Sequence, residues 1–276
     1  MFQTEQQLYS AVILYQCVIT LIVFVNLLYI SAPYGKFGRP GFGRMIQGKL
    51  AWPIFESVPL YAFTVPCLWN GLELSSVQWV LITMWIVHYI NRSIIFPLRA
   101  PSISPISIYV IFSGIAYNLT NGYLNGRWIG HFGAESLSHT QITDIRFCIG
   151  VAMFIFGMYV NITCDNILFD LRRSNSRREA DHNITGGEEG TDIQSRGYYA
   201  IPLRGWFAFV SSPHYLGEII EWTGFAIAAP SPASILMLVF SCVNMVTRAL
   251  KCHQWYKNKF GDRYPRNRMA IIPGIL

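Results

Sequence analysis

The chain is poor in charge. Asp, Glu, Lys and Arg together make up 13% of its 276 residues, whereas hydrophobic residues make up 52%. A soluble globular domain usually carries about a quarter charged residues, so this shortage excludes an ordinary soluble domain and predicts a polytopic membrane protein. The net charge of +6 is then a sign of membrane topology, and we expect no nucleic-acid partner.

Other common signatures are missing as well. The six cysteines form no close-spaced pair, which argues against a disulfide framework and a zinc site. No Gly-x-Gly-x-x-Gly follows a predicted strand, so we expect no Rossmann nucleotide site. His214 and Glu218 could place two ligands on one helix face, but no metal-ligand spacing stands out beyond them, and we expect no metal. Residues 1–7 carry no positive charge, so we expect the first span to remain as an anchor.

What the chain does contain is a series of long apolar runs. About 20 apolar residues cross a bilayer core of about 30 Å as a helix. We therefore expect an all-α integral membrane protein with one domain and seven transmembrane helices. The spans are expected at about 8–31, 50–69, 76–96, 104–124, 147–169, 205–228 and 234–249. The polar stretch 170–204 lacks the apolar residues of a core and is expected to be a flexible cytosolic loop.

The basic residues indicate the orientation. With seven spans, nearly all Lys and Arg residues in the loops fall on one side, and the opposite side carries only Arg127 and Arg146. By the positive-inside rule the N-terminus is outside and the C-terminus is cytosolic. We expect a multi-pass protein of the endoplasmic reticulum in a eukaryote, or of the inner membrane in a bacterium, surrounded by membrane lipid and monomeric.

Several predicted spans carry polar residues near their cytosolic ends. His214, Glu218 and Glu221 are spaced four and three residues apart, so they share one face of a helix. Charge at membrane depth is costly, and such a face should line a cavity or meet a partner rather than touch lipid. Other spans bring polar residues toward the same side: Glu56, His88, Tyr89, Arg92, Asn161, Asp165, Arg172, Arg248, His253, Trp255 and Tyr256.

These residues alone leave the chemistry open. Any one of them could form a helix–helix hydrogen bond or extend to the membrane surface. Glu56 could pair with Arg92, and Tyr89 could belong to the aromatic belt at the membrane interface. Arg172, Arg204 and Arg248 suit phosphate groups, so a nucleotide would have to bind between the helices.

A series of short motifs in a fixed order narrows the possible functions of these residues. They are Ala32-Pro33-Tyr34-Gly35-Lys36, Trp52-x3-Glu56-x2-Pro59, His88-Tyr89-x2-Arg92, Thr143-Asp144-Ile145-Arg146-Phe147, Asn161-x3-Asp165-x2-Leu168, Ile201-Pro202, Tyr215-Leu216-Gly217-Glu218-Ile219-Ile220-Glu221-Trp222, His253-x-Trp255-Tyr256-x2-Lys259-Phe260, Tyr264-Pro265 and Arg268-x2-Ile271-Ile272-Pro273. Carrying these motifs, the chain resembles the steroid 5α-reductase family nearly end to end.

The resemblance implies an NADPH-dependent reductase of the C4–C5 double bond of a 3-oxo-Δ4-steroid or a similar lipophilic enone. It implies that Glu56 and Tyr89 hold the 3-keto oxygen while a hydride adds to the β-carbon and a proton to the α-carbon. A tyrosine hydroxyl, and a glutamic acid kept protonated by an apolar site, can both donate to a developing enolate oxygen. The residues it implies for NADPH are Trp52, Arg92, Asn161, Asp165, Arg172, His214, Glu218, Glu221, Arg248, His253 and Tyr256.

The chain departs from the family pattern in places. Ala200 stands where a basic residue is usual, so Arg196 or Arg204 would have to make that phosphate contact, and His214 stands where asparagine is usual. Residues 172–199 form a longer stretch than in the animal enzymes. Other interpretations remain open: a reductase of another lipid alkene such as a polyprenol or an enoyl thioester, a membrane methyltransferase similar to those that act on isoprenylcysteine, or a non-catalytic lipid-binding protein.

Overall fold

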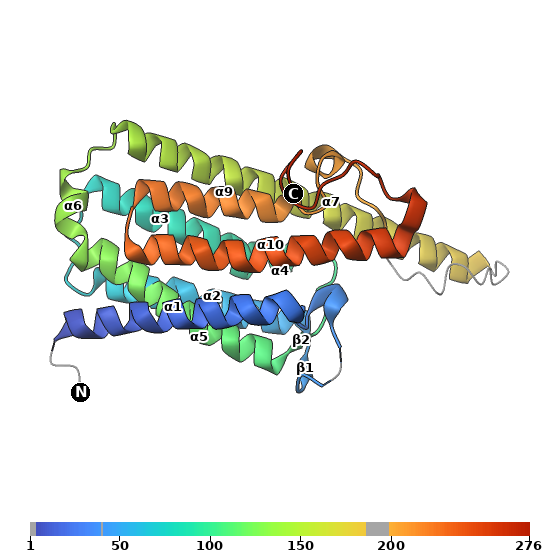
Figure 1. Cartoon of the computed structure of the whole chain (residues 1–276), viewed down its shortest axis with the longest axis horizontal. Coiled ribbons are helices and arrows are strands. Elements are labelled where there is room, and N and C mark those ends of the chain that lie inside the picture. Colours follow the sequence, from blue (N-terminus) through green and yellow to red (C-terminus); the bar gives the residue numbers. More distant parts are fainter. Residues whose placement is uncertain (1–3, 40, 186–198) are drawn as a thin grey trace.

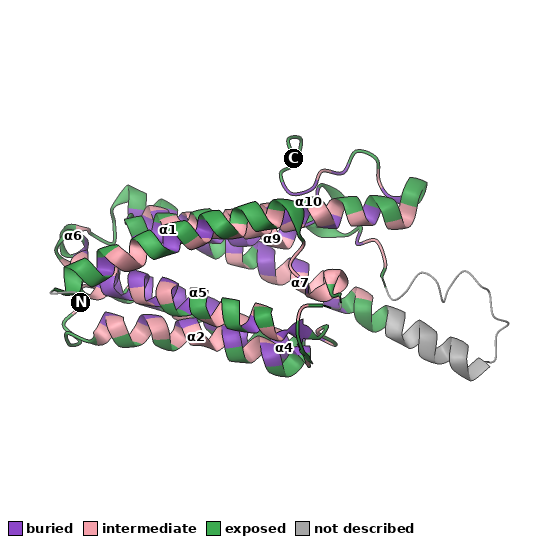
Figure 2. Ribbon diagram, turned by 60° about the horizontal axis from the view of Figure 1, so that its bottom comes forward, coloured by how far each residue is buried: buried purple, intermediate pink, exposed green. Residues whose placement is uncertain are grey.

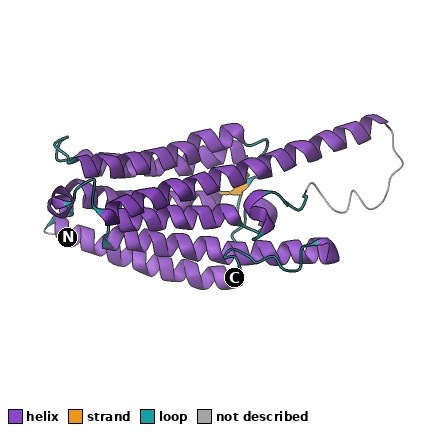
Figure 3. Ribbon diagram, turned by 90° about the horizontal axis from the view of Figure 1, so that it is seen from above, coloured by secondary structure: helices purple, strands orange, loops and turns teal. Residues whose placement is uncertain are grey.

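The computed structural model describes residues 4–39, 41–185 and 199–276. Its long helices lie side by side and form a bundle (Figures 1 and 3). They are α1 (Glu5–Tyr29), α2 (Gly48–Leu68), α3 (Ser76–Ile90), α5 (Ile108–Arg127), α7 (Ile145–Thr185), α9 (Pro213–Ala228) and α10 (Pro232–Phe260). The short elements are η1 (Gly35–Phe37), β1 (Met45–Ile46), η2 (Asn91–Ile95), α4 (Phe96–Arg99), β2 (Ile106–Ser107), η3 (Trp128–Phe132), α6 (Ala134–His139), η4 (Gly205–Ala208) and η5 (Gly261–Arg263).

Within the described residues, four helical stretches are long and apolar enough to cross a membrane. They are Glu5–Tyr29, Ser76–Arg99, Ile145–Ser174 and Pro232–Arg263. The second is longer than α3 alone, because α3 continues through the π-helical turn η2 into α4. One face of α1 is widely exposed (Figure 2), as expected for a helix that meets lipid. These features fit the all-α membrane protein that the composition predicts.

Helix α2 contains three prolines, and its neighbours provide for the backbone groups that these prolines disturb. Pro59 has no N–H for the carbonyl of Phe55, four residues earlier. The Asn118 side chain of α5 donates to that carbonyl at 2.8 Å. The Trp85 indole N–H donates to the Pro59 carbonyl at 3.0 Å. Polar side chains of α3 and α5 thus keep α2 helical in an apolar setting.

Close packing of α2 on α5 depends on glycines at intervals of four. A Cβ added to Gly122 would lie 2.6 Å from the Cβ of Ala62, so no larger residue fits between the helix backbones. Gly126 and Gly130 face the carbonyls of Phe63 and Cys67 in the same way. Small residues at such spacing are typical of helix pairs in membranes.

The pair formed by α7 and α9 uses glycines on both helices. Gly150 packs against Gly224, and a Cβ on Gly150 would lie 2.7 Å from the Gly224 carbonyl oxygen. One heptad along each helix, Gly157 packs against Gly217, where a Cβ on Gly217 would lie 2.8 Å from the Gly157 carbonyl oxygen. The close approach brings polar groups of α9 directly against α7.

Besides the last span, whose helix continues from the expected end at 249 to Phe260, two further predicted boundaries change in the structure. Helix α7 continues to Thr185, so residues 170–185 are helical, where the sequence predicts a loop. This follows from the absence of Gly and Pro between Phe169 and Gly186. The rest of that predicted loop, up to residue 198, lies outside the described residues.

The other change concerns the helix expected over 205–228, which begins only at Pro213. The segment before it forms the 3-10 turn η4 and then pairs with the C-terminal segment from Val210 onward. The Ser211 amide donates to the Met269 carbonyl at 2.8 Å, and the Ser212 amide donates to the Ala270 carbonyl at 3.1 Å. Pro213 then suits the first turn of α9, where its missing N–H costs nothing.

A small two-stranded sheet holds the loops at the same end of the bundle. Strand β1 pairs with β2 in antiparallel register, Met45 opposite Ser107 and Ile46 opposite Ile106. Tyr34, in the segment after α1, forms a further bridge to Ile106. The loops before α2 and α5 are therefore fixed beside the segment that carries Lys36.

Candidate active site

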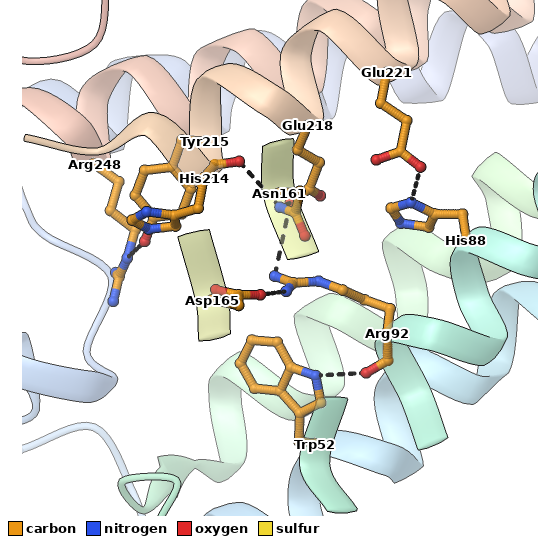
Figure 4. Close-up of polar contacts among 10 residues, drawn as sticks. All are labelled: Trp52, His88, Arg92, Asn161, Asp165, His214, Tyr215, Glu218, Glu221 and Arg248. Carbon is orange, nitrogen blue, oxygen red and sulfur yellow. Dashed lines mark hydrogen bonds and ion pairs between the residues drawn. The ribbon is translucent and has the colours of Figure 1, made fainter. Parts of the chain in front are cut away.

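Arg92 stands at the centre of the polar cluster. Its guanidinium nitrogens lie 3.7 Å from Asp165 and 3.8 Å from Glu218, and its backbone carbonyl accepts a hydrogen bond from the Trp52 indole at 3.1 Å. The guanidinium also lies over the rings of Trp52 and Phe96, 5.1 and 5.0 Å from their centroids. This one side chain therefore links α2, α7 and α9 (Figure 4).

Asn161 joins α7 to α9 beside Arg92. Its amide nitrogen donates to the His214 backbone carbonyl at 3.0 Å and to the Glu218 carboxylate at 3.4 Å. The glycine pair Gly157 and Gly217 permits this contact, because it lets the two backbones approach closely. Glu218 is thus held between an amide and a guanidinium.

Glu221, one turn further along α9, has a different partner. Its carboxylate lies 2.7 Å from His88 Nδ1 of α3, and both side chains are buried. The His88 ring packs on Trp222, with centroids 4.4 Å apart. His88 and Glu221 therefore form a buried pair behind the Arg92 cluster rather than part of an open surface.

Glu56 and Tyr89 lie in the same interior region. The Glu56 carboxyl interacts electrostatically with Arg92, Glu218 and His88. Tyr89 is 6% exposed and interacts electrostatically with Glu56. Arg92 forms its ion pairs with Asp165 and Glu218, so Glu56 is not needed to neutralise it.

A cationic pocket adjoins this cluster. It is lined by Gly35, Lys36, Ser104, Leu168, Leu171, Arg172, Tyr199, Ala200, Phe207, Ser211, Ser212, His214, Tyr215, Arg248, Cys252 and Tyr256. Arg248 donates to the Tyr215 hydroxyl at 2.9 Å and to the Tyr34 carbonyl at 3.1 Å. Arg172 donates to the Ser102 carbonyl at 3.0 Å. Three cationic side chains, Lys36, Arg172 and Arg248, therefore face one pocket.

Lys36 is buried against aromatic rings in this pocket. Its ammonium lies 4.2 Å from the centroid of Tyr256 and 4.5 Å from that of Trp255. Burial lowers the pKa of Lys36 below its ordinary value, and the nearby Arg248 and Arg172 lower it further. An anionic ligand would favour the charged form of this lysine.

The pocket also contains buried polar atoms that fit an anionic dinucleotide. In the described part of the chain, neither Ser212 Oγ nor His214 Nδ1 has a hydrogen-bond partner. Both residues line the pocket with the three cations. Hydroxyl, imidazole and cationic donors are the groups that bind phosphate oxygens, so the donor set fits the phosphates of a nicotinamide cofactor.

His253 lies behind the pocket wall rather than on it. Its Nδ1 is 2.6 Å from Ser211 Oγ, and that hydroxyl is also 2.6 Å from the Tyr264 hydroxyl. Ser211 further contacts the Met269 carbonyl at 3.0 Å. His253 therefore supports the strand-like segment that leads into α9.

The residues predicted from the sequence thus separate into groups. Trp52, Arg92, Asn161, Asp165 and Glu218 meet in one cluster. Arg172, His214, Arg248 and Tyr256 line the cationic pocket. Glu221 instead contacts His88, and His253 contacts Ser211.

Some pocket residues were missed as site residues. Lys36 and Tyr215 belong to motifs noted in the sequence, and only the spatial arrangement shows that they face the pocket. Nothing in the sequence pattern indicated that Cys252 and Tyr199 also line the pocket. Of the proposed substitutes for a basic residue at 200, Arg204 is exposed and is not among the lining residues, and Arg196 lies outside the described residues.

Comparisons with known proteins show the family to which the chain is related. A family model described as 3-oxo-5-alpha-steroid 4-dehydrogenase matches residues 104–187 and 192–276. The chain is 35% identical to steroid 5-alpha-reductase DET2 of Arabidopsis thaliana, covering 94% of this chain and 95% of that protein. It is 33% identical to the protein of that name in Gossypium hirsutum, covering 99% of each. It is 30% identical to 3-oxo-5-alpha-steroid 4-dehydrogenase 1 of Homo sapiens, covering 98% and 96%.

Proposed function

Because this chain belongs to the 3-oxo-5-alpha-steroid 4-dehydrogenase family, we propose that it reduces the C4–C5 double bond of 3-oxo-Δ4-steroids with NADPH. Glu56 and Tyr89 are the proposed catalytic residues. The observation that most supports this is their common position in the bundle interior, within electrostatic reach of Glu218, which belongs to the Arg92 cluster that adjoins the cationic pocket. An apolar substrate and an anionic cofactor can meet only where such regions adjoin.

In the proposed mechanism the two catalytic side chains bind the carbonyl oxygen. The Tyr89 hydroxyl and a protonated Glu56 donate to its two lone pairs, and both hydrogen bonds strengthen as the oxygen gains enolate character. Water is kept away by the aromatic packing of Tyr89 against Trp85 and Trp222, with centroids 5.1 and 5.9 Å apart. A dry setting makes each of these donors more effective than it would be in water.

The cofactor is held by the cationic pocket and the Arg92 cluster. NADPH, when bound, would supply the hydride that adds to C5, and C4 takes up one proton, so that the double bond gains two hydrogens. Lys36, Arg172 and Arg248 would hold its phosphates, with His214 and Ser212 as further donors. Asn161, Asp165 and Glu218, in the Arg92 cluster that adjoins that pocket, could bind its ribose or carboxamide groups.

This function also needs the proposed membrane orientation. We place α1, α2, α3 with α4, α5, α7, α9 and α10 as seven spans, with the N-terminus outside and the pocket on the cytosolic side. Lys36, Arg172 and Arg248 then lie on the side where positive charge is favoured. A cysteine added in the η1 segment and probed with a membrane-impermeant reagent should react only after the membrane is opened.

The central experiment measures steroid-dependent oxidation of NADPH by the purified protein. Glu56→Gln and Tyr89→Phe should each lower kcat by about 100-fold or more, as for the loss of an oxyanion donor. Tyr61→Phe on the exposed side of α2 and the exposed Glu73→Gln are matched controls that should keep full activity. Undiminished turnover by both catalytic-site variants would remove these residues from the mechanism.

The same assay separates the competing activities. Progesterone and testosterone are offered as enones, a polyprenol as another lipid alkene, and an isoprenylcysteine peptide with a methyl donor as the methyltransferase substrate. Only the enones should be consumed with NADPH. Turnover of one of the others without the enones would contradict the proposal.

A further inference from the structure

A second polar group lies inside the bundle, away from the cationic pocket and the Arg92 cluster. It consists of Gln16 of α1 with Tyr117, Thr120 and Asn121 of α5. Gln16 is 1% exposed and Asn121 is 2% exposed. Two amide side chains buried this deeply in an apolar bundle require partners for their donors.

The contacts of this group leave donors free. Thr120 Oγ1 donates to Gln16 Oε1 at 2.5 Å, and Asn125 donates to Asn121 Oδ1 at 3.0 Å. Both acceptor oxygens are therefore engaged. Among the described residues, Asn121 Nδ2 has no hydrogen-bond partner, and the Gln16 amide nitrogen and the Tyr117 hydroxyl have none beyond their contact with each other. If the Gln16 amide donates one N–H to the Tyr117 oxygen, its second N–H, the Tyr117 O–H and the Asn121 amide still lack an acceptor.

The group adjoins the proposed enone site. Tyr117 lies within electrostatic reach of Tyr89, and Gln16 lies beside Tyr117. The Tyr117 ring is stacked on Phe240 of α10, with centroids 3.6 Å apart, which fixes its position. Asn121 is one turn beyond Tyr117 on the same face of α5, about 6 Å further along the axis.

We propose that Gln16, Tyr117 and Asn121 form a second polar subsite that binds an oxygen substituent of the substrate other than the enone carbonyl. The inference rests on the proposed function, in which Glu56 and Tyr89 already occupy the two lone pairs of the carbonyl oxygen. Amide N–H groups require an acceptor, and a ring hydroxyl or a second ketone provides one. The preferred substrate class is therefore a 3-oxo-Δ4-steroid with a second oxygen, rather than one that is hydrocarbon beyond the enone.

The expected selectivity follows from the cost of unpaired donors. A substrate that lacks the second oxygen would leave buried amide donors without partners, and sites built to hydrogen-bond an oxygen discriminate strongly against analogues that lack it. We expect at least a 10-fold preference in kcat/KM for the oxygenated steroid.

The test compares steroids that share the enone and differ beyond it. Androst-4-en-3-one carries no second oxygen, testosterone carries a hydroxyl at C17, and 11β-hydroxyandrost-4-en-3-one carries one in the middle of the ring system. The wild-type protein should prefer at least one oxygenated steroid by 10-fold or more, mainly through KM. Asn121→Leu and Gln16→Leu should each bring the ratio of kcat/KM values close to one. Asn26→Leu, on the exposed side of α1, is the matched control that should keep the ratio.

Equilibrium binding of the same steroids to the wild-type protein provides a second readout. It does not depend on catalysis or on the folding of any variant. Equal binding and equal turnover of the three steroids would overturn the subsite while leaving the reductase proposal intact. Reduction of none of them would refute the reductase proposal, and a binding preference would then still support the subsite. A preference unchanged in both leucine variants would also overturn it.

Discussion

His88 Nδ1 lies 2.7 Å from the Glu221 carboxylate, and both side chains are withdrawn from solvent. This contact joins α3, which carries Tyr89 and leads into Arg92, to α9, which carries Glu218. The pair therefore fixes the distance between the proposed carbonyl site and the proposed cofactor wall. We therefore expect this pair to position the other residues.

Breaking this pair from one side should destabilise the protein strongly. Glu221→Leu leaves the His88 ring buried without its partner, and we expect a loss of about 3 kcal/mol or more in the free energy of unfolding. The double variant His88→Leu with Glu221→Leu removes both polar groups and should recover part of that loss. Thermal unfolding of the detergent-solubilised protein measures both. Additive losses would show that the two residues are not coupled.

The glycine contact between α7 and α9 makes a second prediction. A Cβ at Gly217 would lie 2.7 Å from the backbone nitrogen of Asn161 and 2.8 Å from the backbone carbonyl oxygen of Gly157. Gly217→Ala should therefore separate the helices and cost about 1–3 kcal/mol in unfolding free energy. Gly114→Ala is the matched control, because its Cβ would meet only the Phe55 ring, at 3.1 Å. Equal melting temperatures for both variants would contradict the close packing.

Polar and charged residues within apolar stretches were the sequence feature that located the candidate site. His214, Glu218 and Arg92 were expected to face one cavity or a partner, because charge at membrane depth is costly. The structure does join α3 to α9 through Arg92 and Glu218. The sequence could not decide which carboxylate pairs with Arg92, because Glu56 and Asp165 offer the same chemistry, and only the helix arrangement separates them.

Other features depend on knowing which helices are neighbours. Gly157 and Gly217 have no meaning as a pair until α7 is placed against α9. Likewise, the contact between Ser211 and His253 depends on the C-terminal segment, because the Ser211 backbone pairs with that segment. Such long-range backbone contacts leave no periodic pattern in the chain, and for this reason the start of α9 was predicted too early.

The lowered pKa of Lys36 predicts that the proposed nucleotide binding depends on pH. An anionic cofactor favours charged Lys36, so binding takes up a proton once the pH exceeds the pKa of the free protein. The affinity should therefore fall as the pH rises through that pKa, which burial places below the ordinary value of about 10.4. In Lys36→Arg the side chain stays charged, and this decline should disappear. Titration of NADPH binding between pH 7 and pH 10 provides the comparison. A decline of the same size in Lys36→Arg would assign it to another group.

The hydrogen bond from Asn118 to the Phe55 carbonyl gives a test of how α2 tolerates Pro59. Asn118→Leu would leave that carbonyl without a partner, because Pro59 has no N–H to offer. We expect a loss of about 1 kcal/mol in unfolding free energy, which is typical for such bonds in membranes. Asn244→Leu is the matched control, since Asn244 donates to the Phe240 carbonyl of its own helix, which keeps its backbone bond. If the two variants unfold at the same temperature, the proline in α2 does not need the support of α5, and the carbonyl must be accommodated within α2 itself.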